Sequence, residues 1–428
     1  MKRPFSALST RAPVVLAALT AVLLVPGQSA AESEPVALPR TGPAVPELAS
    51  FDRIITELMR KHEIPGGAVA VAKDGRLLLA RGYGLADVEG CRPVQPDALF
   101  RIASVSKPIT AAAVLVLVER GRLDLDAKVV DLLASLRPQA GRQVDPRFCE
   151  ITVRQLLHHT GGFDRGKSFD PMFGPPVMTE AHGAPLEAPT IVRFMWGRPL
   201  DFPPGTRYAY SNFGYCLLGR VIEEVTGEAY EESVQALVLR PMGITRMRLG
   251  RTRREQAAAA EVCYYPPAGA QPVASVFPEQ KQRVTVPYGG FYLEAMDAHG
   301  GWIASAVDLV RFATRLAGDG TPGLLKPRTI RWIASRPAAP VSEGEPAYYG
   351  LGWSIRPVGG SANWWHTGSL PGTSSLLVRT HHGLVWAAVF NRRPRHGDDF
   401  CGQLDQALWR AAGEVKTWPE HDLFNHFR

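Results

Sequence analysis

The residues of this chain best suited to chemistry begin with Ser104 and Lys107, which stand three positions apart. They lie where the stretch Leu99 to Ala103 leads into an apolar helix predicted from about Val105 to Arg120. Side chains three residues apart share a helix face, so the hydroxyl and the amine lie within reach of each other. A serine attacks a carbonyl only when a base takes its proton, and a lysine in a dry site can be neutral enough to help. The helix N-terminus adds N–H groups that stabilise an oxyanion.

This pair does not identify a site by itself. A Ser-x-x-Lys pattern arises by chance roughly once in a chain of this length, and a capping serine beside an exposed lysine is the ordinary alternative. The surroundings favour chemistry, because a lysine at the start of an otherwise apolar helix is poorly placed to reach water.

Two further segments carry side chains that would complete such a site. Tyr210 and Asn212 flank Ser211 in a turn before a helix predicted over 213–225. A phenol near a lysine can be held partly ionised and relay the serine proton, while an asparagine amide can hold a substrate carbonyl or the lysine. The second segment is the end of a predicted strand, where a glycine lets a ligand approach the strand edge: His366, Thr367, Gly368 and Ser369.

Hydrophobic patterning predicts the elements that position these residues at the two ends of the chain. A helix is expected from Phe51, followed by strands at 68–72 and 77–83 joined by an Asp-Gly turn. Strands return over 348–355, 363–366, 374–380 and 384–390, before a helix from Phe400 to Ala412.

The middle of the chain, about 123 to 300, reads as mainly helical. Helices are predicted after Thr152, Thr190 and Ser211, and a capping box at Ser305 opens another. The segments 163–189 and 264–292 are expected to form cleft walls. Strands from both chain ends can complete one antiparallel sheet flanked by helices, with the helical middle inserted as a lobe. The predicted fold class is therefore α+β, an α/β sandwich with its cleft at the seam.

The three motifs occur in the order of one known set, and other segments agree with it. These are Phe100–Ser104, Leu156–Gly162, Asn212–Tyr215, Pro241–Gly243, and Gly300–Trp302 leading into Ser305 and Asp308. From about Phe51 to Ala412 the chain resembles the serine beta-lactamase and penicillin-binding-protein superfamily. The branch is the one with class C beta-lactamases, D-alanyl-D-alanine carboxypeptidases and related esterases.

The resemblance implies a role for each matching residue. Ser104 would be the acylated nucleophile, Lys107 and Tyr210 the acid and base pair, and Asn212 a substrate contact. The N–H groups of Ser104 and Ser369 would form the oxyanion hole, and Thr367 and Gly368 would line the substrate strand. Many beta-lactamases carry Lys at the position of His366, so this histidine is closer to the carboxypeptidase-like members. The implied function is hydrolysis of a D-Ala-type peptide, a beta-lactam or a carboxylic ester, without metal or organic cofactor.

Two alternatives compete with that interpretation. A catalytically silent member would bind penicillin or cell-wall peptides without turnover, although the retained serine, lysine and tyrosine favour an enzyme. The segment 161–168 also matches the pattern Gly, four residues, Gly-Lys-Ser of a P-loop nucleotide triphosphatase. A P-loop must follow a buried strand and open a helix, whereas here a predicted helix precedes the match and prolines follow it.

The first 31 residues are predicted to be a secretory signal, with a basic start, an apolar run from Val14 to Val25 and cleavage near Ala31. The protein is therefore expected to be periplasmic or secreted, with no membrane span once the signal is removed. A Pro-rich linker over 32–50, a hydrolase domain over 51–415 and a tail over 416–428 are expected to follow. Export permits disulfides, but no pairing can be deduced among Cys91, Cys149, Cys216, Cys263 and Cys401.

Composition excludes several other classes. The chain of 428 residues is 45% hydrophobic and 21% charged, which is typical of a globular protein rather than a fibre. Its formal charge is +7, and loss of the signal leaves 45 basic and 41 acidic residues, or +4. No basic run marks a nucleic-acid partner, and the histidine pairs at 158–159 and 381–382 lack metal-ligand spacing. The expected partner is a small-molecule or peptide substrate, and the oligomeric state is not readable.

Overall fold

The computed structural model describes residues 38–136, 142–173, 186–267, 269–318, 322–338, 341, 343–395 and 399–427. The predicted signal sequence lies outside the described residues. No helix in these ranges is both long and apolar enough to cross a membrane.

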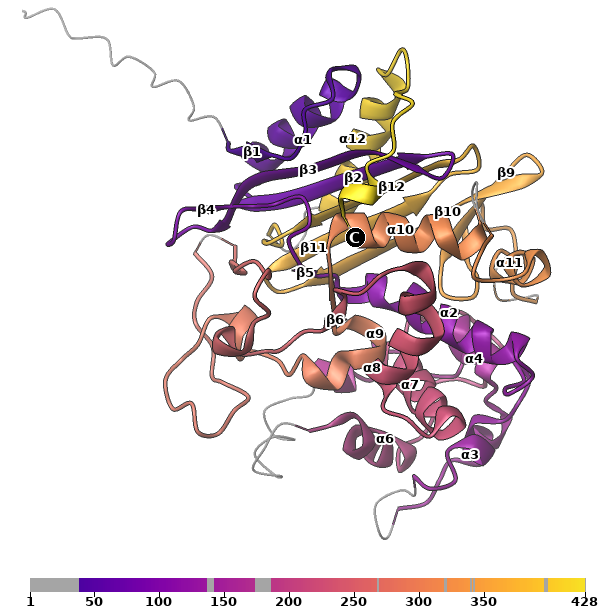
Figure 1. Ribbon diagram of the computed structural model, residues 1–428. Coiled ribbons are helices and arrows are strands. Elements are labelled where there is room, and N and C mark those ends of the chain that lie inside the picture. The colour runs from indigo at the N-terminus through magenta and orange to yellow at the C-terminus, as the bar shows by residue number, and fades with distance from the viewer. Residues whose placement is uncertain are drawn as a thin grey trace, which may run out of the picture. The chain divides into compact units, whose positions relative to one another are not determined.

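One antiparallel sheet joins strands from both ends of the chain (Figure 1). The two halves meet where β2 (Gly66–Lys73) pairs with β12 (Leu384–Phe390), with Gly67 opposite Phe390. The strand order is β1 (Arg40–Thr41), β3 (Arg76–Asp87), β2, β12, β11 (Thr373–Arg379), β10 (Ser361–Leu370), β9 (Ser354–Val358) and β8 (Tyr348–Tyr349), and β4 (Arg92–Pro93) also pairs with β3. The expected α+β class and the sheet built from both chain ends are confirmed.

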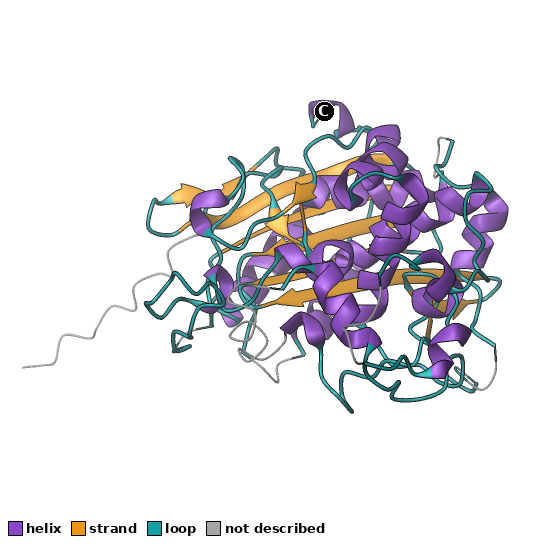
Figure 2. Cartoon of the chain, turned by 90° about the horizontal axis from the view of Figure 1, so that it is seen from below, coloured by secondary structure: helices purple, strands orange, loops and turns teal. Residues whose placement is uncertain are grey.

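Helices cover both faces of this sheet, as Figure 2 also shows. Strand β2 alternates Ala and Val, so its two faces enter different cores. Val69 and Val71 pack with α1 (Ala49–Lys61) and α12 (Phe400–Gly413), whereas the alanines face α10 (Ala306–Ala317) and the helical lobe. The small alanine side chains allow α10 to lie close to the strand.

The helix that follows Ser104 is buried over almost its whole length. In α2 (Ser106–Glu119) every residue from Ser106 to Leu117 is buried, which confirms the predicted central apolar helix. The other helices of the lobe are α3 (Val129–Leu132), α4 (Val153–Leu157), α6 (Ala188–Trp196), α7 (Asn212–Thr226), α8 (Tyr230–Val234) and α9 (Asp297–Gly300). Helix α11 (Pro327–Ile333) follows later in the chain. A small sheet joins β5 (Phe100–Arg101), β7 (Trp302–Ala304) and β6 (Arg248–Leu249).

Short turns of tighter or wider helix complete the described secondary structure. A π-helical turn, η5, covers Gln235–Leu239. The 3-10 turns are η1 (Pro46–Leu48), η2 (Ala103–Val105), η3 (Pro146–Glu150), η4 (Pro171–Phe173), η6 (Arg240–Met242), η7 (Arg254–Gln256), η8 (Val286–Tyr288), η9 (Glu294–Met296) and η10 (Phe424–His426).

Local capping signals were accurate at three of the four predicted helix starts. The hydroxyls of Thr152, Ser211 and Ser305 each accept a backbone N–H of the helix that they open. Thr190 is not such a cap, because α6 begins at Ala188 and Glu187 occupies the cap position. Proline at the second helical position explains the earlier start, since it needs no N–H partner there.

Three segments differ from the sequence expectation. Strands β8 and β9 replace the single strand expected over 348–355, because the chain turns at residues 350–353. The expected linker is partly packed: β1 pairs with β3, and Leu48 is fully buried. The tail beyond 415 also packs on the body, where Leu423 N–H donates to Leu77 O at 2.8 Å.

Candidate active site

The segment before Ser104 has a strained backbone that neighbouring strands hold in place. Ala103 has φ of 47°, in the left-handed region that side chains with a Cβ seldom adopt. Ile102 N–H donates to Trp302 O at 3.0 Å, and the Ser375 hydroxyl donates to Ile102 O at 2.7 Å. Ser104 therefore sits in the turn η2 at the entry of α2, held between β7 and β11.

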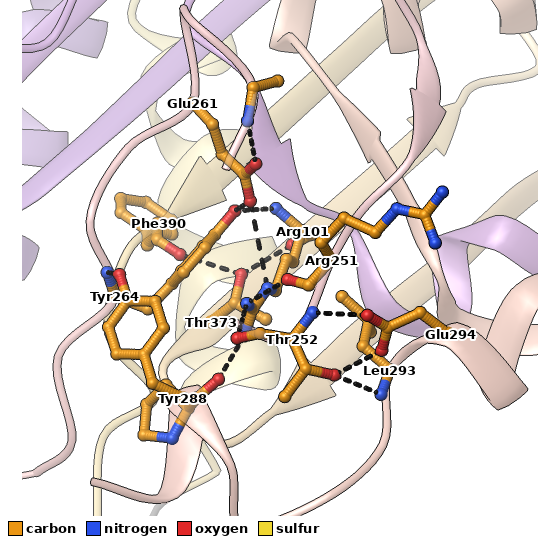
Figure 3. A network of polar contacts seen from close by, with 12 residues as sticks. Arg101, Arg251, Thr252, Glu261, Tyr264, Tyr288, Leu293, Glu294, Thr373 and Phe390 are labelled. Carbon is orange, nitrogen blue, oxygen red and sulfur yellow. Dashed lines mark hydrogen bonds and ion pairs between the residues drawn. The ribbon is translucent and has the colours of Figure 1, made fainter. Parts of the chain in front are cut away.

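The buried side chain of Arg101, at the start of the same segment, belongs to a network of polar contacts (Figure 3). The Arg101 guanidinium donates to Pro287 O at 2.6 Å and to Arg251 O at 2.7 Å, and it lies 3.9 Å from the Glu261 carboxylate. The Thr373 hydroxyl donates to Arg101 O at 2.6 Å. Because the side chains of the Arg101 and Glu261 pair are each only 1% exposed, this cluster is a structural hub rather than a surface ion pair.

Lys107 lies directly beside Ser104 and has no contact with solvent. Its Nζ is 3.1 Å from Ser104 Oγ, 2.8 Å from Asn212 Oδ1 and 2.9 Å from the His299 backbone oxygen. Burial holds the pKa of the Lys107 ammonium well below its ordinary value of 10.5. The amine is therefore available in its neutral form far below the pH at which an exposed lysine would be.

Asn212 links Lys107 to a carboxylate that the sequence did not single out. The Asn212 amide accepts from Lys107 through Oδ1 and donates through Nδ2 to Asp170 Oδ2 at 2.6 Å. Asp170 also lies 3.8 Å from the Arg165 guanidinium. Both residues come from the segment predicted to form a cleft wall, but nothing local in that segment distinguishes Asp170 from a solvated loop carboxylate.

Tyr210 packs against Lys107 and a histidine. Lys107 Nζ is 4.7 Å from the centre of the Tyr210 ring, and the His159 ring centre is 4.4 Å away. Burial raises the pKa of the Tyr210 phenol above its ordinary value, against smaller opposing effects of Ser104 and of the Arg165 charge. Burial therefore opposes the partly ionised phenol that the sequence suggested, and its effect on the Tyr210 pKa is larger than that of the Arg165 charge.

His366 is a neutral histidine with both ring nitrogens satisfied. Nδ1 lies 2.8 Å from Thr367 O, which can only accept, so Nδ1 carries the proton. Nε2 then accepts from the Tyr349 hydroxyl at 2.8 Å. Burial lowers the pKa of His366 to about 3. His366 therefore offers no positive charge to a substrate near neutral pH.

A cavity of about 360 Å³ opens onto Ser104. Gly368 lies where β10 passes the nucleophile segment, and a Cβ at this position would collide with Ile102 O and Ser375 Oγ. No described residue of the segment 264–292 lines the cavity, contrary to expectation. The lining residues are Ser104, Arg165, Tyr208, Tyr210, Tyr349, Ser354, His366, Thr367 and Ser369.

All three predicted motifs thus meet at one place. Lys107 and Asn212 lie behind the cavity, and residues of the other two motifs line it. The sequence did not single out His299 or Tyr349, although His159 belongs to a quoted motif. His299 contributes only its backbone oxygen to the site, so its side chain carried no signal.

The P-loop alternative is contradicted. The matching segment follows helix α4 rather than a strand, and η4 comes after it. The Lys167 ammonium donates to Asp201 O at 2.8 Å, so it joins its loop to the segment at residue 201. All five cysteines are free thiols. Among the described residues, no group of three or more His, Cys, Asp or Glu is placed to hold a metal ion.

Comparisons with known proteins agree with the arrangement of these motifs. The family model described as Beta-lactamase matches residues 51–406. Esterase EstB of Burkholderia gladioli is 35% identical over 46% of this chain, but the match spans only 50% of the esterase. Penicillin-binding protein 4* of Bacillus subtilis is 27% identical over 86% of this chain and 75% of its own length.

Among solved structures, D-amino acid amidase from Ochrobactrum anthropi SV3 has the same fold. The TM-score is 0.66 with 23% identity, and the match covers 87% of this chain and 99% of the amidase. The sheet and helical lobe are therefore of the beta-lactamase and transpeptidase type.

Proposed function

Because the chain belongs to the Beta-lactamase family, we propose that it is a serine hydrolase that cleaves an amide or ester through an acyl-enzyme. The observation that carries this proposal is the 3.1 Å contact between Lys107 Nζ and Ser104 Oγ in a site without water access to the lysine. Esterase, amidase and penicillin-binding relatives support the same class of chemistry.

In the acylation step, neutral Lys107 is the base. A neutral amine has two N–H bonds, and Asn212 Oδ1 and His299 O are both oxygens that only accept. These two bonds leave the nitrogen lone pair for Ser104, whose hydroxyl proton it takes as Oγ attacks the carbonyl. The N–H groups of Ser104 and Ser369 stabilise the oxyanion.

Tyr210 is the acid for the leaving group. Its raised pKa keeps the phenol protonated, and Tyr210 lines the same cavity as Ser104. Proton donation to the leaving group produces a phenolate beside the Lys107 ammonium formed in the previous step. That phenolate then takes a proton from the water that attacks the acyl-enzyme. As the acyl bond breaks, the Lys107 ammonium returns its proton to Ser104 Oγ, so the lysine becomes neutral again and the serine regains its hydroxyl.

The neutral state of His366 bears on the choice of substrate. A lysine at this position would hold a carboxylate, whereas His366 presents an uncharged ring already bound to Tyr349. This favours an ester that is uncharged at this position over a substrate with a carboxylate there, such as a beta-lactam or a peptide with a free C-terminus.

The cellular setting remains a proposal from the sequence. We propose a cleaved signal over 1–31 and a periplasmic or secreted enzyme, with one hydrolase domain extending to about residue 415. An intact-mass measurement on the exported protein tests this, because cleavage near Ala31 gives a chain that begins at about Glu32.

Covalent labelling tests the proposed function. A fluorophosphonate or fluorescent penicillin should tag the wild type but not Ser104→Ala, and rates on a short ester, nitrocefin and a D-Ala-D-Ala peptide should rank the substrates. A matched control is Ser106→Ala, which removes a neighbouring hydroxyl that does not line the cavity. A folded wild type that is never labelled and turns nothing over would instead support a silent binding protein.

A further inference from the structure

Among the described residues that line the cavity at Ser104, Arg165 is the only one with a charged side chain at neutral pH. Burial lowers the pKa of His366 to about 3, so that ring is neutral. Burial also raises the pKa of each tyrosine in the lining above its ordinary value, so the phenols keep their protons. An arginine stays protonated at any pH at which enzymes work. The lining therefore offers a substrate one positive charge and no negative charge.

The Arg165 guanidinium is not occupied by contacts within the fold. Its side chain is 51% exposed, and its ion pair with Asp170 is 3.8 Å long, which is beyond hydrogen-bond length. The guanidinium carbon lies 4.9 Å from the centre of the Tyr210 ring, which is a contact with the face of the ring and not with an acceptor oxygen. A guanidinium has five N–H donors in a planar fork, so donors of Arg165 are free for a ligand.

The Asp170 carboxylate, in contrast, is occupied by other donors. Oδ2 accepts from Asn212 Nδ2 at 2.6 Å, and Oδ1 accepts from the Met172 backbone N–H at 3.1 Å. Asp170 has a side chain only 13% exposed and does not belong to the cavity lining. An anionic group in the cavity therefore meets the Arg165 guanidinium directly, whereas the Asp170 carboxylate stays outside the lining.

Arg165 and His366 come from different walls of this cavity. Arg165 follows helix α4 in the helical lobe, whereas His366 belongs to β10 of the sheet. A carboxylate that finds no cation on the sheet wall finds one on the lobe wall. The cavity measures about 360 Å³, so one small ester or amide can reach both Ser104 and Arg165.

We propose that Arg165 is a specificity-determining residue and that the substrate is an ester or amide that carries a carboxylate, which the guanidinium binds through paired N–H···O bonds. The inference rests on the proposed function, because it names the substrate class of that same site. The carboxylate can belong to the acid part of the substrate or to its alcohol or amine part, and two substrate series distinguish these sources.

Pairs of esters that differ in one charge test the proposal. Mono-4-nitrophenyl adipate and 4-nitrophenyl hexanoate have acyl chains of equal length with and without a carboxylate, and 3-acetoxybenzoate and 3-acetoxybenzamide differ in the same way in the leaving group. In Arg165→Gln, the ratio of kcat/KM for the anionic ester to kcat/KM for its neutral partner should fall roughly 10-fold to 100-fold in at least one series, the range for a hydrogen bond to a charged group. Arg165→Lys should keep part of this ratio, because the charge stays but the planar fork is lost.

The ratio also separates recognition of the substrate from an effect on the proton network. The Arg165 charge acts on the pKa values of Lys107 and Tyr210, but that effect is common to both esters of a pair and cancels. Arg198→Gln is the matched control, because Arg198 is an exposed arginine of the same lobe that lies over the Phe169 ring at 5.0 Å and does not line the cavity. Unchanged ratios in Arg165→Gln for both series, or an equal fall in Arg198→Gln, would overturn the assignment.

Binding without turnover separates this inference from the proposed function. If the wild type hydrolyses none of these esters, the proposed function fails, but the intact esters can still be mixed with Ser104→Ala and followed by saturation-transfer NMR. Binding of an anionic ester that is lost when Arg165→Gln is added, and kept when Arg198→Gln is added instead, would support a carboxylate subsite. Equal binding of the anionic and neutral esters, or no binding of either anionic ester, would overturn it.

Discussion

Among the single residues of the site, Lys107 depends most on its surroundings, because they set the protonation state of its amine. Its nitrogen lies between one hydroxyl and two carbonyl-type oxygens, and burial favours its neutral form. Burial also favours the neutral form of Tyr210, because desolvation disfavours whichever form is charged. For a phenol the neutral form is the protonated one, so Tyr210 keeps its proton whereas Lys107 loses one. One dry pocket thus provides a base and an acid.

Lys107→Arg tests whether neutrality rather than charge is required. Arginine stays protonated, so kcat/KM should fall roughly 100-fold to 10,000-fold, about as much as in Lys107→Ala. Circular dichroism should show that both variants are folded. Near-normal turnover by Lys107→Arg would contradict a neutral base.

Asp170 should act on the pH dependence through Lys107. Its negative charge favours the lysine ammonium and so raises the pKa of Lys107 against the dominant effect of burial. Asp170→Asn keeps a hydrogen-bond partner for Asn212 but removes that charge, so the acid limb of kcat/KM should move to lower pH. Asp170→Ala should also lower the plateau roughly 10-fold to 100-fold, because the Asn212 amide loses its anchor.

The matched control for Asp170 is Asp126→Asn, which alters an exposed ion pair with Arg154. Its pH profile should overlay that of the wild type. If the acid limb moves in both variants or in neither, Asp170 does not act on Lys107.

At the scale of elements, the site depends on how closely β10 approaches η2. Gly368 is the point of contact, since there is no room for a side chain between it and the Ile102 carbonyl. The oxyanion donors proposed at Ser104 and Ser369 belong to these two elements, so their separation controls the geometry of the oxyanion hole.

Gly368→Ala should therefore separate the two donors and lower kcat/KM roughly 100-fold to 1000-fold, the range for loss of an oxyanion contact. Gly360→Ala, in the turn before β10, has no atom within 4 Å of the added Cβ and should behave as wild type. Steady-state kinetics on one ester suffices, and equal rates in the two variants would argue against a shared oxyanion hole.

The Arg101 cluster supports the same elements from the core. Arg101→Met leaves the Glu261 carboxylate buried without its cation and should lower the free energy of unfolding by about 3 to 5 kcal/mol. Adding Glu261→Gln should recover part of that loss, because the amide carries no charge to desolvate. Urea unfolding measures both, and a double variant less stable than the single would refute this account.

At the scale of the whole molecule, packing around the site buries several histidines in their neutral form. Burial lowers the pKa of His158 to about 4 and that of His366 to about 3, from an ordinary value of 6.5. An unfolded chain takes up these protons below pH 6.5, whereas the folded chain does so only near pH 4 or below. Acid should therefore favour unfolding.

The expected outcome is that the free energy of unfolding falls as pH drops from about 6.5 toward 4, with about 3 kcal/mol of this from His158 alone. Urea unfolding at a series of pH values measures the slope. His158→Gln keeps an N–H donor for Tyr349 O but cannot titrate, so its slope should be shallower. An unchanged slope would exclude His158 as a contributor.

Local features of the fold could be predicted from the sequence alone. The three-residue spacing that brings Ser104 in η2 beside Lys107 in α2, the caps at Ser211 and Ser305, and the Asp-Gly turn between β2 and β3 depend only on nearby residues. The joining of strands from both chain ends also followed from their order, because unpaired strand edges must find partners.

Only the tertiary structure identified the oxygen of His299 and the carboxylate of Asp170 as parts of the site. His299 is 192 positions from Lys107, and no local pattern reports such a contact. The protonation states of Lys107, Tyr210 and His366 were likewise decided by folding. Desolvation depends on everything that packs around a group, whereas residue type and spacing describe only its chain neighbours.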